Sequence, residues 1–238
     1  LRLHSSLLYQ NDNVIVTTGY RKVHDEGTPG YSDTRADIGM VQMMMPAKGG
    51  TLTIRSDTVR YDMGELVPGE WESMTGTCFS GGCNPAGGKT RATGSLIAAA
   101  WDNGVWAFDI GTTPIGFHYT DITGALSYSF NWGDTSLTAE AYRRAKDASL
   151  LAYGGQRDPA TGKWWGGVRR TGVSLSASRD DGTGIGLWGK ISAETIRGRN
   201  VADNTSWQAM GTAYTRLIST PNHEFTPSFF VMLWGFDK

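Results

Sequence analysis

Charged and aromatic residues occur at every second position in several stretches of the sequence. Glu140, Tyr142 and Arg144 form one such run, and Trp188 and Lys190 belong to another. Because successive side chains of a β-strand point to opposite faces, each run would lie on one face of its strand. A face that gathers charges in this way is typical of a wall around a water-filled space. The residues that we assign to this face are Arg55, Asp57, Asp109, Glu140, Tyr142, Arg144, Trp188, Lys190, Glu194 and Arg216.

Catalysis is the other chemistry that such residues could perform. Glycoside hydrolysis needs two carboxylates, which Asp109, Glu140 and Glu194 could supply, but their separation cannot be read from the sequence. A nucleophilic mechanism needs a histidine base close to its nucleophile. The four histidines fall in predicted loops or turns, with no nucleophile-elbow motif beside them. We therefore predict that the chain is not an enzyme.

Two cysteines, Cys78 and Cys83, lie in the glycine-rich stretch GTCFSGGCNPAGG. Their spacing predicts a small disulfide loop in an oxidising compartment, and two free thiols are the alternative. Zinc usually takes four nitrogen or sulfur ligands, and the sequence has no third cysteine and no histidine nearby. The glycines of GIGLWG at 184–189 fit a dinucleotide-binding pattern, but this stretch enters a predicted strand with no helix after it. We predict neither a metal nor a cofactor.

A long connection from Asp147 to Arg170 is rich in polar and aromatic residues. Long loops tend to carry function, and folding this one inward would gate an exit or offer tryptophans for stacking. An outer loop stabilised by its own glycines is an equally good interpretation. The residues that we single out here are Gln156, Arg157, Asp158, Trp164, Trp165 and Arg169.

The elements that would position these residues are predicted to be strands. In the run DITGALSYSFNW, residues 121–132, the even positions carry Ile, Gly, Leu, Tyr, Phe and Trp, whereas the odd positions are small or polar. This alternation describes a strand between an apolar and a polar medium, and one strand alone fits a soluble sandwich equally well. Similar patterns predict about eleven strands, near 13–23, 34–45, 51–62, 91–101, 105–110, 121–132, 137–144, 171–178, 185–195, 207–217 and 225–236.

Short and long connections alternate between these strands. Tight turns are predicted at 47–50, 102–104, 133–135, 180–184 and 221–224, and longer connections at 24–33, 63–90, 111–120, 145–170 and 196–206. In an up-and-down meander, every second connection lies at the same end of the sheet. Short turns at one end and long loops at the other are typical of outer-membrane barrels, although soluble barrels can share the asymmetry.

Charge and hydropathy restrict the partners and the kinds of membrane segment that the chain could have. The net charge is -1, from 22 basic and 23 acidic residues, so we expect no nucleic-acid partner. No apolar run is long enough for a transmembrane helix, but β-barrels cross membranes without one. Outer-membrane barrels usually close with an even number of strands, so we expect either a missed strand near 1–9 or further strands beyond the last residue. The chain is therefore expected to be one domain, 1–238, that forms part of a larger barrel.

Several motifs resemble the C-terminal barrel of the cellulose synthase operon protein C family. They are WAFDIGTTPIGF (106–117), SLLAYGGQRDPATGKWWGGVRRTGVSLSAS (149–178), RGRNVADN (197–204) and LWGFDK (233–238). Upstream, GTPGYSD (27–33) and IRSDTVRYDMG (54–64) extend the likeness over nearly the whole chain.

The resemblance implies an antiparallel up-and-down outer-membrane β-barrel of about sixteen strands, of which this chain supplies the N-terminal part. It implies export of cellulose to the cell surface, contact with outer-membrane lipid, and partners in the cellulose synthase complex reached through a tetratricopeptide-repeat region outside this chain. The charged face would then line the path of the glucan without catalysis. A general porin or another polysaccharide-export barrel is the alternative.

Overall fold

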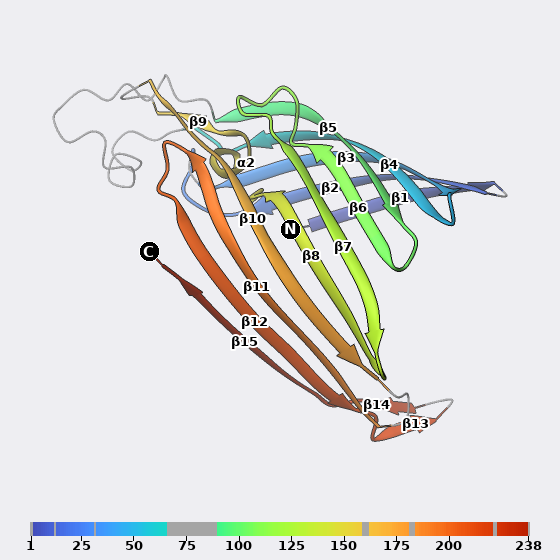
Figure 1. Ribbon diagram of the computed structural model, residues 1–238. Helices are drawn as coiled ribbons and strands as arrows, with labels where there is room; N and C mark the ends of the chain where they lie inside the picture. Colours follow the sequence, from blue (N-terminus) through green and yellow to red (C-terminus); the bar gives the residue numbers. More distant parts are fainter. Residues whose placement is uncertain are drawn as a thin grey trace.

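The computed structural model describes residues 2–11, 13–30, 32–65, 90–158, 162–180, 184–220 and 223–237. Its main element is one curved antiparallel sheet in which twelve strands lie side by side in chain order (Figure 1). The strands are β1 (Arg2–Asn11), β2 (Val14–Asp25), β3 (Thr34–Ala47), β4 (Gly50–Asp62), β5 (Arg91–Asp102), β6 (Trp106–Thr112), β7 (Ile122–Trp132), β8 (Thr135–Ala145), β10 (Trp164–Arg179), β11 (Ile185–Arg199), β12 (Asn204–Thr215) and β15 (Ser228–Phe236).

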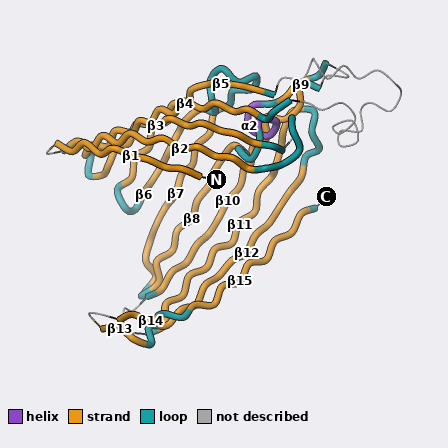
Figure 2. The backbone as a smooth tube through the Cα atoms, turned by 180° about the vertical axis from the view of Figure 1, so that it is seen from behind, coloured by secondary structure: helices purple, strands orange, loops and turns teal. Residues whose placement is uncertain are grey.

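The predicted all-β, up-and-down architecture is confirmed, and the predicted count of eleven strands is wrong by one. The additional strand is β1, in the stretch near 1–9 where a missed strand was considered, and it pairs with β2 along its whole length. The sheet is not closed, because β1 and β15 form its two edges and are not paired with each other. Figure 2 shows these two edge strands separated by the open side of the sheet.

The short turns lie at one end of the sheet and the long connections at the other, as predicted (Figure 1). Between β3 and β4, Lys48 and Gly49 both have positive φ, of 47° and 73°, which is the two-residue turn that matches strand twist. Between β5 and β6, the Asn103 side chain accepts hydrogen bonds from the backbone N–H groups of Val105 and Trp106 at 3.0 and 2.7 Å. The turn predicted at 221–224 is more elaborate, because β13 (Ile218–Thr220) and β14 (His223–Phe225) form a small hairpin of their own.

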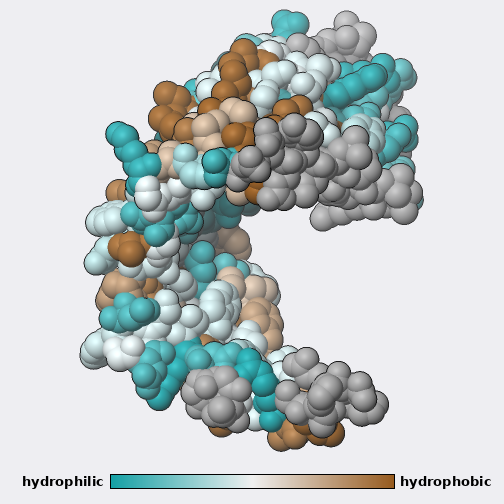
Figure 3. Space-filling view, turned by 90° about the vertical axis from the view of Figure 1, so that its right-hand side faces the viewer, coloured by the Kyte–Doolittle hydropathy of each residue, from teal (hydrophilic) through white to brown (hydrophobic). Residues whose placement is uncertain are grey.

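The two faces of the sheet differ as the alternation predicted. On β7 the even-numbered apolar residues point to the convex face, where Ile122 is 64% exposed and Trp132 is 78% exposed. The odd-numbered positions face the concave side, which Figure 3 shows as a hollow open on one side. Among the described residues, no helix is long and apolar enough to cross a membrane.

A small hydrophobic core covers part of the concave face. Helix α2 (Leu150–Gly154) folds inward from the β8–β10 connection and packs on β3 and β4. The rings of Tyr61, Phe117 and Tyr153 meet edge to face, with centroids 5.7 to 6.1 Å apart. Leu150 is 1% exposed, and the Ser149 hydroxyl caps the helix by accepting a hydrogen bond from the Ala152 N–H at 3.2 Å. This core holds the long-connection end of the sheet around α2.

Candidate functional site

The concave faces of β6, β8, β10 and β11 carry a connected set of charged side chains. Arg144 on β8 binds Asp109 on β6 through two hydrogen bonds, of 2.5 and 2.6 Å. These residues reach each other across β7, which presents only Thr123 and Ala125 between them. Asp109 and Arg144 come from the strands on either side of β7, so their ion pair links three neighbouring strands on the concave face.

Glu140 continues this set toward β11. One of its oxygens lies 4.0 Å from Nη2 of Arg144, and the other lies 3.8 Å from Nζ of Lys190. The Ser174 hydroxyl on β10 also donates to Glu140 at 3.3 Å. The negative charge of Glu140 is therefore shared between two cations, and its side chain remains partly exposed to the hollow.

Glu194 on β11 is the centre of a second group. Its carboxylate accepts hydrogen bonds from the Tyr142 hydroxyl at 2.9 Å and from the Ser206 hydroxyl at 3.3 Å, and it lies 3.7 Å from Nη1 of Arg170. The Tyr142 and Glu140 side chains come from alternate positions of β8, so the two groups are adjacent on one face. Together, they make a polar surface in which each carboxylate has a hydrogen-bonding partner.

A groove of about 710 Å³ runs along this surface. Its polar lining includes Glu140, Lys190 and Glu194, and Trp188 adds an indole. The last strand contributes further rings, because β15 turns Trp234 and Phe236 toward the groove opposite Gln208 and Ser206 of β12. Trp234 and Phe236 are 60% and 55% exposed, so the groove combines hydrogen-bonding groups with accessible aromatic surfaces.

Four of the ten predicted lining residues lie outside this groove, and one of them is Asp109, although its partner Arg144 lines the groove. Arg55 and Asp57 form a bidentate pair at 2.7 and 2.5 Å on the concave face of β4. Asp57 is only 2% exposed, so the prediction that it lines an open space is wrong: it lies beside Val59 and Tyr61 of the core. Arg216 lies at the short-turn end, where it binds Asp180 at 2.7 Å.

The predicted loop from Asp147 to Arg170 is shorter than expected. Strand β10 begins at Trp164, so Trp164, Trp165 and Arg169 belong to a strand rather than to a loop. The start of β10 could not be predicted from alternation, because a β-bulge lies between Gly166 and Arg169. Gly166 and Gly167 have positive φ, of 103° and 59°, and they interrupt the pattern of alternating faces.

The other residues singled out in this connection occupy a short hairpin. Strand β9 (Gln156–Arg157) pairs with Trp164 and Trp165. The Gln156 amide donates to the Gly30 carbonyl at 3.0 Å, and the backbone N–H of Asp158 donates to the Lys163 carbonyl at 2.7 Å. With α2, this hairpin brings the connection back over the sheet instead of leaving it extended.

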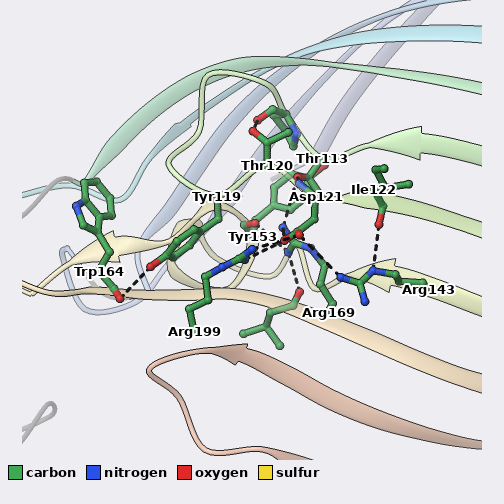
Figure 4. A network of polar contacts seen from close by, with 12 residues as sticks. Thr113, Tyr119, Thr120, Asp121, Ile122, Arg143, Tyr153, Trp164, Arg169 and Arg199 are labelled. Atoms are coloured by element: carbon green, nitrogen blue, oxygen red, sulfur yellow. Dashed lines mark hydrogen bonds and ion pairs between the residues drawn. The ribbon is translucent and has the colours of Figure 1, made fainter.

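Three arginines surround Asp121 where this connection meets β7 (Figure 4). Arg169 lies 2.9 Å from its carboxylate, Arg199 binds it at 3.0 and 3.3 Å, and Arg143 lies 3.8 Å away. Burial raises the pKa of Asp121, but the hydrogen bond from Arg199 and the three positive charges outweigh it and hold the pKa below its usual value. Asp121 is therefore ionised at neutral pH.

Comparison with known proteins assigns the chain to a family. Residues 32–238 match the family described as cellulose synthase operon protein C C-terminus. The chain belongs to the cellulose synthase operon protein C family. Over its whole length it is 38% identical to cellulose synthase operon protein C of Escherichia coli and 36% identical to that of Salmonella typhimurium. A protein of the same name from Xanthomonas axonopodis is 36% identical over 61% of this chain.

The chain spans about a fifth of the length of these relatives, 21% for the Escherichia coli protein and 20% for the Salmonella protein. The family name connects the chain with the cellulose synthase operon. Cys78 and Cys83 of this family member lie outside the described residues, so the predicted disulfide stays a prediction. Within the described part of the chain, no group of three or more metal-ligating side chains comes together.

Some groove residues of this family member were missed by the sequence analysis. Arg170 lies two positions before Gly172 and four before Ser174, so the period of two along this strand would have placed all three on the concave face. Trp234 and Phe236 were harder to find, because β15 is apolar on both faces and gives no alternation. Their side is fixed only by the register with β12.

Proposed function

We propose that this chain forms part of the wall of an outer-membrane channel through which a β-1,4-glucan leaves the periplasm. The single observation that carries the proposal is the opposition of two faces on one curved sheet. One face is an exposed apolar band, and the other holds a groove of paired charges and exposed rings.

The convex face has the properties of a surface that contacts lipid. Several large apolar side chains there are between 48% and 64% exposed, namely those of Phe108, Ile110, Ile122, Leu126 and Val173. Soluble monomers rarely expose contiguous apolar areas of this kind. Trp106 and Trp132 lie near the short-turn end and Trp207 near the opposite end, at 46%, 78% and 52% exposure, which supports two interfacial girdles.

The concave groove suits a chain of sugar rings. A β-1,4-glucan has two apolar ring faces and a rim of hydroxyl groups, so it can stack on Trp188 or Trp234 and hydrogen-bond to Glu140 or Glu194 along one track. Transport requires many weak contacts rather than one strong site, by analogy with ion conduction. Carboxylates that already have cationic or hydroxyl partners fit this requirement, because none of them presents an isolated charge that would trap the chain.

The ion pairs of these carboxylates are also the reason that we propose no catalytic step. A glycosidase needs one carboxylic acid free to protonate the leaving oxygen and a second carboxylate placed across the bond. Asp109, Glu140 and Glu194 each lie within 4.0 Å of an arginine or lysine. We therefore propose transport without a chemical step, driven by other members of the cellulose synthase complex.

The inward fold of α2 and β9 supports a further role for the connection between β8 and β10. Because α2 packs on the concave face, its movement would widen the passage at the long-connection end, which faces the cell exterior in outer-membrane barrels. We propose that this connection gates the exit, with Gln156, Arg169 and Trp165 holding its closed position.

Three substitutions test the proposal, two of them at neighbouring positions of β11. Trp188→Ala removes a ring from the groove, whereas Leu187→Ala removes a side chain of the convex face that is 50% exposed. We expect cellulose export by cells that carry Trp188→Ala or Glu140→Ala to fall, while Leu187→Ala retains export and all three proteins stay in the outer membrane. Unchanged export in both groove variants would contradict a glucan track at this surface.

A further inference from the structure

A shallow groove of about 1020 Å³ crosses the convex face near the long-connection end. Many of the side chains along it are apolar or small, and Arg143 and Asp121 are among its polar residues. Gly124 of β7 pairs with Ile110 of β6, and Ala141 of β8 lies between Leu126 and Val173. The bulky neighbours are more than half exposed, so they form walls on either side of the small residues. The small residues between bulky ones make the groove long and shallow, so that it could hold an extended apolar chain. We call this groove the trough.

A positively charged cluster stands at one end of this trough. Arg143 lines it and comes from the same strand and face as Ala141. Its Nε donates to the Ile122 carbonyl at 3.1 Å, its side chain is 49% exposed, and none of the described residues gives its Nη1 a hydrogen-bonding partner. The Nε group of Arg143 is thus held by a hydrogen bond, and its Nη1 group remains available to a ligand.

The local charge is unbalanced. Arg143, Arg169 and Arg199 all face the single carboxylate of Asp121, and within the described residues no other carboxylate lies within 4.0 Å of these three guanidiniums. Three positive charges and one negative charge leave a formal excess of two positive charges. Figure 4 shows Arg143 reaching this cluster from the side of Ile122, and both residues line the trough.

We propose that the trough binds a membrane glycolipid that carries a phosphate monoester, with an acyl chain along Gly124 and Ala141 and the phosphate on Arg143. A phosphate monoester carries about −1.5 to −2 charges at neutral pH, which matches the excess of the cluster better than the single charge of a phosphodiester does. An arginine N–H group forms a strong, charge-assisted hydrogen bond with a phosphate oxygen, so the open Nη1 group is well suited to it. The inference rests on the proposed function, because it requires the convex face to lie in a bilayer.

The same sheet offers a matched control. Arg197 lies at the same end on β11, is 72% exposed, and already has Asp203 at 3.4 Å. It does not line the trough. Replacing Arg197 removes the same charge from the same end of the sheet, so a general electrostatic attraction would respond equally to either substitution.

The test measures lipid retention by native mass spectrometry on the complete protein, purified from outer membranes. The probes are lipid A with its phosphate monoesters, lipid A after their removal, and phosphatidylglycerol. We expect Arg143→Gln to weaken retention of phosphorylated lipid A by roughly tenfold, the loss expected for one charge-assisted hydrogen bond, and Arg197→Gln to leave it unchanged. Ala141→Leu, which fills the trough and keeps the charge, should also weaken retention.

Equal retention by the wild type and Arg143→Gln would overturn the site, as would equal losses in the two arginine variants. Release by inorganic phosphate alone, or equal dependence on Arg143 for phosphatidylglycerol, would overturn the choice of a phosphomonoester lipid. The proposed channel fails separately: it would be contradicted by a protein that does not fractionate with the outer membrane, before any lipid is measured.

Discussion

Arg144 controls the balance of charge on the concave face, because it holds Asp109 at 2.5 Å and also lies 4.0 Å from Glu140. Arg144→Gln would leave two carboxylates with less positive charge beside them, so the complete channel should become more selective for cations. Asp109→Asn disrupts the same pair with the opposite change of charge and should shift selectivity toward anions. Reversal potentials in a salt gradient measure both shifts, and a shift in the same direction for both variants would contradict a lining role for this pair.

Asp121 is expected to stabilise the long-connection end in a pH-dependent way. Arg169 is 4% exposed, so Asp121→Asn leaves a buried guanidinium without its carboxylate and should lower the free energy of unfolding by about 3 kcal/mol at neutral pH. The pKa of Asp121 lies below its usual value of 3.8 in the folded state. Its contribution is therefore full above pH 3.8 and is lost as the pH falls through the lowered pKa.

Thermal unfolding of the wild type and Asp121→Asn across this pH range measures the effect. The two curves should differ at neutral pH and converge in acid. Asp203→Asn is the matched control, because Asp203 is 61% exposed and its pair with Arg197 should contribute little at any pH. A difference between the wild type and Asp121→Asn that does not depend on pH would contradict this assignment.

At the scale of elements, strands could be predicted from alternation because each strand separates two media. The pattern at 121–132 gave β7 to within one residue, and the face of Glu140, Lys190 and Glu194 followed from the same period of two. The start of β10 and the side of β15 could not be predicted in this way. A glycine bulge interrupts the first pattern, and the second strand is apolar on both faces.

Helix α2 could not be predicted either, because it has only five residues, Leu150–Gly154, and is too short to show a helical period. It is held by tertiary contacts, chiefly those of Leu150 and Tyr153 with Tyr61 and Phe117. The expectation that this connection folds inward rested on its length and its tryptophans. The apolar contacts of α2 use residues that the sequence analysis did not single out, whereas Gln156 and Arg169, which it did, add hydrogen bonds to the Gly30 and Tyr153 carbonyls.

Leu150→Ala tests the role of α2 as a unit. Removing a side chain that is 1% exposed should destabilise the packing of α2 by roughly 2 to 5 kcal/mol and release the connection from the concave face. Single-channel conductance of the complete protein should then rise. Leu151→Ala is the control, since Leu151 is only partly buried. Equal conductance in the wild type and Leu150→Ala would contradict a gating role for this connection.

At the scale of the whole molecule, the curved sheet has two free edges, β1 and β15. Unpaired backbone groups are costly in hydrocarbon, so a functional wall needs partner strands at both edges. The aromatic concave face of β15, with Phe230 and Trp234 exposed, would then continue the proposed glucan-contacting surface toward a partner strand at that edge. The groove described above is thus one part of the circumference of the proposed channel.

The central claim is that this groove recognises a β-linked glucan. The most direct test is single-channel current through the complete barrel in a planar bilayer, with cello-oligosaccharides and malto-oligosaccharides of equal length added to the same pore. We predict block by the cello-oligosaccharides at concentrations where the malto-oligosaccharides have little effect, and weaker block in Trp188→Ala. Equal weak block by both series would contradict the claim and indicate a general porin.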